Sequence, residues 1–176
     1  MCPPQFRRLT ELRGWTTSPP IGLTPMELRS PAGDTLQITI GGYQFPDAHD
    51  PAQRYSWHMV QGTASSNGTT WNFHWPALTC DEWALLSIWL RRVARLLSHP
   101  PDATAEWPPP LQFNEPNLRL ALTTATSSSA TIRAGLDYEF QPPGTNFGTP
   151  YNLDLTVTKR DLLQAADDWD AARWAV

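Results

Sequence analysis

Short segments in which apolar and polar residues alternate recur along the chain, and this period of two constrains the fold more than any other feature. The clearest are 36–40, 118–122, 132–140 and 151–157. A strand with one buried face has this period, because successive side chains point to opposite faces of a sheet. Such strands in close succession favour antiparallel pairing with one wet face. The pattern therefore predicts an antiparallel, meander-rich β-sheet of about six to seven strands.

Residues 55–75 are expected to form an aromatic hairpin around the dipeptide Asn67-Gly68, with aromatic or apolar residues at the odd positions of 55–59 and 71–75. A two-residue loop would place these rows on opposite faces, because one residue of slip reverses the faces of a strand. A three-residue loop, 66–68, with Gly68 in the left-handed position, would place both rows on the same face. We predict this loop, with the aromatic rows filling the inner face of the sheet rather than lining a ligand cleft.

Two capped amphipathic helices should cover the sheet, which makes the fold class α+β. Thr79 and Glu82 form a capping box before apolar residues at helical spacing, and prolines after His99 end that helix. Thr158 and Asp161 mark the start of the second helix. Its predicted buried stripe consists of Leu162, Ala165, Ala166, Trp169 and Ala172 or Arg173.

Proline-rich stretches suggest how the chain is organised. Five prolines among residues 1–25 interrupt backbone hydrogen bonding, so we expect an irregular N-terminal arm there. Residues 26–176 are expected to form a single α+β domain, because a chain of this length suits one core. Residues 47–53 and 99–110 are expected to be loops.

Charge and cysteine content narrow the function classes. A net charge of -4 and a pI near 5.5 argue against a nucleic-acid partner and suit a basic one. Cys2 and Cys80 lie far apart and predict no structural disulfide. The chain lacks a long apolar run, and residues 1–13 do not resemble a secretion signal. We therefore expect a cytoplasmic protein without a membrane partner.

Two histidines of the hairpin raise a metal hypothesis. In the predicted register, His58 and His74 share the face opposite the aromatic rows, and Asp47, His49 or Asp50 could add a ligand. The chain has no H-x-H, H-E-x-x-H or paired-cysteine spacing. We therefore interpret the histidines as exposed polar residues and expect no metal centre.

Carboxylates suggest two further sites. Glu115, beside Pro116, could serve as an acid or base, although we favour a structural role in which it or Asn117 satisfies amides at a bulge. Asp167, Asp168 and Asp170 form either a solvated helix face or a patch for a basic partner. A nucleophile elbow, a cysteine–histidine pair and a phosphate-binding glycine loop are missing from the sequence, so we expect neither catalysis nor a cofactor.

Several segments, in order, resemble the WapI-type immunity proteins over roughly residues 35 to 170. They are 42–46, 57–60, Trp71 with 76–79 leading into 86–90, and 111–118. The most specific are Tyr-Gln-Phe-Pro at 43–46 and Glu-Pro-Asn-Leu at 115–118. The resemblance implies a strand-rich domain with a final amphipathic helix. It also implies stoichiometric neutralisation, in the producing cell's cytoplasm, of secreted contact-dependent toxins whose C-terminal domains include nucleases.

Three hypotheses follow. The first is a non-catalytic immunity protein that binds a cognate protein toxin, with candidate partner-binding residues Trp57, His58, His74, Glu115, Asp167, Asp168 and Asp170. The second is a small-ligand-binding or hydrolytic domain that uses His58, His74 and Glu115. The third is a structural accessory of a virion or secretion system, which a large apolar oligomer interface would support.

Overall fold

The computed structural model describes residues 24–97, 107–146 and 148–172 and confirms the α+β class. Within these ranges the strands number eight rather than six to seven, and they form two antiparallel sheets. Sheet A contains, in spatial order, β1 (Met26–Arg29), β2 (Thr35–Tyr43), β3 (Trp57–Ser66) and β4 (Thr69–Thr79). Sheet B contains β5 (Leu111–Gln112), β6 (Leu118–Ala125), β7 (Ser129–Leu136) and β8 (Tyr151–Thr158). Both sheets are meanders, whereas the alternation predicted a single meander-rich sheet.

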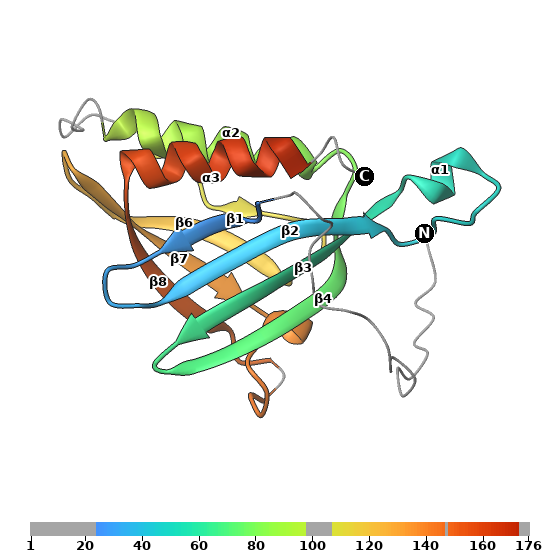
Figure 1. Ribbon diagram of the computed structural model, residues 1–176, viewed down its shortest axis with the longest axis horizontal. Coiled ribbons are helices and arrows are strands. Elements are labelled where there is room, and N and C mark those ends of the chain that lie inside the picture. The colour runs from blue at the N-terminus through green and yellow to red at the C-terminus, as the bar shows by residue number, and fades with distance from the viewer. Residues whose placement is uncertain (1–23, 98–106, 147, 173–176) are drawn as a thin grey trace.

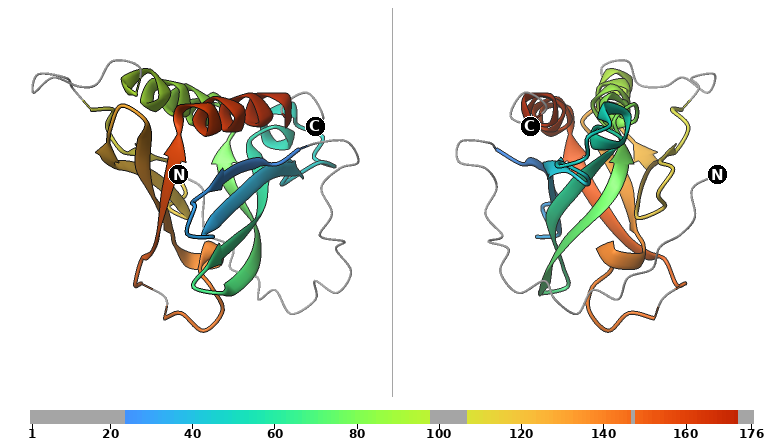
Figure 2. Two further views of the ribbon diagram at one scale, coloured as in Figure 1. Left: turned by 60° about the vertical axis from the view of Figure 1, so that its left-hand side comes forward. Right: turned by 90° about the vertical axis from the view of Figure 1, so that its right-hand side faces the viewer.

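Two long helices, α2 (Trp83–Leu96) and α3 (Lys159–Ala172), lie side by side above the sheets (Figure 1). The turned views show the sheets facing each other beneath this helical layer (Figure 2). Helix α3 packs mainly against β1 of sheet A and also contacts β8 of sheet B, whereas α2 contacts β5 of sheet B. Two short helices, α1 (Pro51–Arg54) and the 3-10 turn η1 (Tyr138–Phe140), complete the described elements. The predicted arm at 1–25 and loop at 99–110 fall largely outside the described residues.

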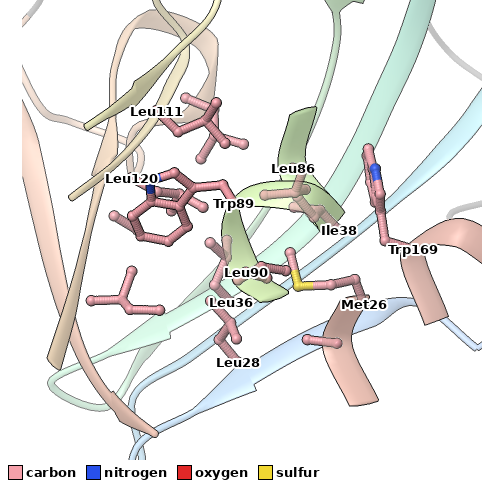
Figure 3. Close-up of a cluster of buried hydrophobic side chains, with 14 of the residues drawn as sticks. Met26, Leu28, Leu36, Ile38, Leu86, Trp89, Leu90, Leu111, Leu120 and Trp169 are labelled. Carbon is pink, nitrogen blue, oxygen red and sulfur yellow. The ribbon is translucent and has the colours of Figure 1, made fainter. Parts of the chain in front are cut away.

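One hydrophobic cluster joins both sheets and both long helices. In Figure 3, Leu86, Trp89 and Leu90 of α2 lie between Leu111 and Leu120 of sheet B and the side chains of sheet A. Burial of these faces supplies the main driving force for folding, at roughly 25 cal/mol per Å² of apolar surface removed from water.

The predicted capping contacts are complete at α3, whereas at α2 the Glu82 N–H donates to the backbone O of Thr79 rather than to its hydroxyl. The Thr158 N–H and hydroxyl each donate to the Asp161 carboxylate at 2.8 Å, and the Asp161 N–H donates back at 3.3 Å. At the other helix, Thr79 N–H donates to Glu82 at 2.9 Å, although regular α2 begins only at Trp83. The predicted stripe of α3 is confirmed, because its buried residues are Leu162, Ala165, Ala166, Trp169 and Ala172.

The predicted three-residue hairpin loop is wrong. Ser66 pairs with Thr69, which leaves the two-residue turn Asn67-Gly68 with φ values of 50° and 78°. Positive φ at both positions is the type I′ geometry, whose twist matches that of paired strands. Odd positions of β3 therefore pair with even positions of β4, as in Gln61 opposite His74. The aromatic rows consequently lie on opposite faces, and those of β4 face the core.

Three further boundaries differ from the expectations. The predicted loop 47–53 contains the start of α1, whose Asp50 cap accepts a hydrogen bond from Ala52 N–H at 3.0 Å. The predicted strand 132–140 ends at Leu136, because Tyr138, with φ of 54°, turns the chain into η1. Strand β1 had no predicted counterpart.

Candidate functional site

Five rings in contact run from the surface at one end of sheet A into the core. Tyr55 meets Tyr43 edge-on, with centroids 5.0 Å apart, and Tyr43 stacks on His58 at 4.9 Å. His58 lies 5.6 Å from Trp83, which stacks on Trp169 at 4.6 Å. The outermost ring, Tyr55, is 48% exposed, whereas Trp169 is fully buried. We call these five residues the aromatic row.

The inner end of the row is fixed to the backbone. Trp169 Nε1–H donates to Trp83 O at 2.9 Å, so the first turn of α2 and the last turns of α3 are joined by both a stack and a hydrogen bond. Stacked aromatic pairs contribute about 0.5–1.5 kcal/mol beyond their buried area. The row therefore rests on a rigid base.

The outer end is held by backbone contacts between consecutive segments. A bulge between Ile40 and Gly42, with φ of +126° at Gly42, shifts the register of β2 before its last two pairs with β3. Gln44 N–H donates to Trp57 O at 3.0 Å, and Cys80 N–H donates to Ser56 O at 3.3 Å. In Figure 1, α1 and its loop project beyond the ends of the sheets and of α2 and α3.

The prediction that His58 and His74 share a face is wrong, and the two-residue turn is the reason. His58 points inward into the aromatic row and is buried. His74 pairs with Gln61 on the outer face, where burial lowers the pKa of its imidazole. Among the described residues, histidine, cysteine and carboxylate side chains form no group of three suited to a metal ion.

The segment around Glu115 joins sheet B to the start of α2. Asn114 N–H donates to Glu82 Oε1 at 2.6 Å, and Asn117 Nδ2 donates to Glu139 at 2.8 Å. Burial, followed by the charges of Glu139 and Glu82, raises the pKa of Glu115. The acceptor for the Asn114 N–H is Glu82 rather than Glu115 or Asn117, and the Asn117 side chain instead donates to Glu139. Glu139 and Glu82 are the charged neighbours that shift the pKa of Glu115.

The predicted acidic patch is partly engaged within the protein. Arg91 of α2 donates to Asp167 and to Asp170, each at 2.7 Å, and so bridges the two helices. Asp168 accepts a hydrogen bond from Gln164 at 3.0 Å. Two of the three carboxylates are therefore paired with one internal cation, which offsets one of their two negative charges.

Trp57, the remaining candidate, begins β3 and lies half-buried on the face away from His58. The seven candidates thus occupy separate places rather than one site. Tyr43, Tyr55 and Trp83 were not among them. The Tyr-Gln-Phe-Pro motif and the Asp50-Pro51 helix start were the sequence signals that could have identified this region.

A recess of about 420 Å³ lies between the β1–β2 turn and the start of α3. Pro31 and Val157 contribute apolar surface, and Thr158 and Asp161 lie at its edge. These last two groups are already bonded to each other in the helix cap. None of His58, His74 and Glu115 lines it.

In the part of the chain that the structure describes, helices that could span a membrane are absent.

Comparisons with known proteins identify the family. Neither the curated proteins nor the solved structures gave a match. The sequence pattern of the immunity protein WapI-like family matches residues 27–173, which include both sheets and the long helices. The chain belongs to the WapI-like family of immunity proteins.

Proposed function

We propose that this protein neutralises a secreted protein toxin by binding the toxin's C-terminal domain stoichiometrically in the cytoplasm of the producing cell, without catalysis. The observation that carries the proposal is the family match over residues 27–173. The net charge of -4 suits a basic toxin domain, such as a nuclease, because complementary charge accelerates association.

Co-expression tests neutralisation. Secreted-toxin genes are sought beside the gene for this chain, and the C-terminal domain that each encodes is placed under an inducible promoter. Growth should survive induction when this chain is present and fail when an immunity protein for an unrelated toxin replaces it. Equal growth arrest with both chains would refute the proposal.

Titration separates binding from catalysis. Purified chain is added in increasing amounts to a fixed amount of purified toxin domain, and the remaining toxin activity is measured. A binding protein reaches full inhibition near equimolar ratio if its affinity is nanomolar. Complete inhibition at one chain per fifty toxin molecules would instead require turnover and would contradict the non-catalytic mechanism.

A further inference from the structure

The exposed end of the aromatic row carries unusual surface chemistry. Tyr55 is 48% exposed and Phe45 is 37% exposed, and the half-buried Tyr43 lies in contact with Tyr55. The segments that carry them run side by side, as the bond between Gln44 and Trp57 shows. Aromatic residues are enriched in the energetically important centres of protein interfaces. We call Tyr43, Phe45 and Tyr55 the aromatic end.

Tyr43, and Tyr55 through its contact with Tyr43, are held in place before any partner arrives. Tyr43 stacks on buried His58, which leads through Trp83 to the core. The loop beside them is closed by Arg54 Nε, which donates to Ala48 O at 2.9 Å. A preorganised contact surface loses less conformational entropy on binding than a mobile one. The aromatic end therefore meets a physical requirement for tight recognition.

Carboxylates surround this end. Asp47 and Asp50 lie exposed on the loop between β2 and α1, and exposed Asp81 follows Cys80, which bonds to Ser56. None of the three aspartates forms an ion pair within the described part of the chain. Between residues 41 and 60 Arg54 is the one lysine or arginine, and its guanidinium lies 6.0 Å from the Tyr55 ring centroid. An apolar centre with an acidic rim complements a partner that has lysines or arginines around an apolar hollow.

A second pair of exposed apolar side chains lies among positively charged residues. Leu85 and Ile88 project from α2, 41% and 56% exposed, on a helix that also exposes Arg92 and Arg95. This face would repel a basic partner, and it offers aliphatic rather than aromatic side chains. It therefore supplies a matched control.

We propose that the aromatic end, with Asp47, Asp50 and Asp81 as its acidic rim, is the surface through which this protein holds a basic toxin domain. This inference rests on the proposed function and adds to it the interface and the chemistry of the partner's contact surface. The aromatic rings supply the buried centre of the complex, and the carboxylates steer the approach and pair with cations at the edge.

The test uses the full chain and the neighbouring toxin domain, with affinity measured by calorimetry and association rate by surface plasmon resonance. Tyr55→Ala and Phe45→Ala should each weaken binding by about thirtyfold or more, as truncation of a central anchor does. The double change Asp47→Asn with Asp81→Asn should slow association several-fold and flatten its salt dependence. Ile88→Ala should change affinity by less than about threefold, and thermal melts should show all variants folded.

The outcomes separate the two proposals. If the parent chain binds but both Tyr55→Ala and Phe45→Ala bind within threefold of it, the interface assignment is wrong and the proposed function stands. A larger loss for Ile88→Ala than for Tyr55→Ala would also overturn the assignment, in favour of the α2 face. If the parent chain neither binds nor protects, the proposed function fails, and the interface fails with it.

Discussion

Among the charged side chains near the start of α2, Glu82 should contribute most to the free energy of unfolding. It is only 8% exposed and joins three elements, the end of β4, the start of α2 and the loop after β5. Its oxygens accept from Thr79 N–H and Thr79 Oγ1 at 2.9 Å and from Asn114 N–H at 2.6 Å. Glu82→Ala removes all three acceptor contacts at once.

The expected loss follows from those contacts. The Thr79 hydroxyl can rotate toward water, whereas two backbone N–H groups lose a charged acceptor. Each unsatisfied donor costs about 1–3 kcal/mol when it is buried, and less where water can reach it. Since Thr79 is half-buried and Asn114 is exposed, we expect Glu82→Ala to lower the free energy of unfolding by about 2–4 kcal/mol. Glu82→Gln keeps one acceptor oxygen and should lose about half as much.

Urea unfolding at pH 7, followed by tryptophan fluorescence, measures this loss, with the slope against urea checked to be unchanged. Asp81→Ala is the matched control, because its side chain is the exposed neighbour of Glu82, and it should change stability by less than about 0.5 kcal/mol. If Glu82→Ala and Asp81→Ala unfold at the same urea concentration, Glu82 does not hold the three elements together and the reasoning fails.

Three other substitutions test separate parts of the fold. Gly62→Ala should lower the free energy of unfolding in urea by about 2 kcal/mol or more, because the added Cβ would lie 2.4 Å from Gln37 O and 2.5 Å from Phe73 Cζ. Gly68→Ala has open space around the added Cβ, but its φ of +78° is strained for alanine, so it should lower that free energy by about 1 kcal/mol. Equal losses would contradict this account of the sheet. Trp169→Phe should lose about 1–3 kcal/mol, because it removes the bond to Trp83 O and part of the stack, and an unchanged midpoint would contradict it. The folded-state pKa of Glu115 is raised, so its charged form opposes folding once the pH rises past the unfolded pKa of about 4.3. Glu115→Gln should therefore be at least as stable as the parent at pH 7, with the difference vanishing below about pH 4, and a variant that is less stable at pH 7 would refute this sign.

Features that depend on neighbours in sequence could be predicted from the chain. The cap formed by Thr158 and Asp161 and the buried stripe that includes Trp169 require only helical spacing, and both are present. The pairing of β6 with β7 likewise follows from alternation and a short connection, and alternation alone marks β8 after the longer segment 137–150. The division into two sheets could not be predicted this way, because it depends on which distant faces pack together. Strand β1, with only Met26 and Leu28 buried, is too short to show a period.

The candidate site was harder to predict because it depends on register. A three-residue loop would place the two aromatic rows on one face, but the structure has them on opposite faces, joined by the two-residue turn that Asn67-Gly68 favours. That single residue of slip moves His58 from the expected polar face into the aromatic row. Asp50-Pro51 did carry a local helix signal, and recognising it would have predicted α1 beside Tyr55.

If the aromatic end is the proposed interface, the aromatic row should couple stability to partner binding in one direction only. A change at the buried end, such as Trp169→Phe, removes packing on which Trp83, His58 and Tyr43 depend in turn, so it should lower both stability and partner affinity. A change at Tyr55 removes a half-exposed ring at the outer end of the row. It should therefore lower partner affinity while the free energy of unfolding stays nearly constant. An interface on α2 would instead leave affinity insensitive to Trp169→Phe under conditions where the variant stays folded. Measuring the free energy of unfolding and the partner affinity of Trp169→Phe therefore tests whether packing at the buried end of the row positions the side chains at its exposed end.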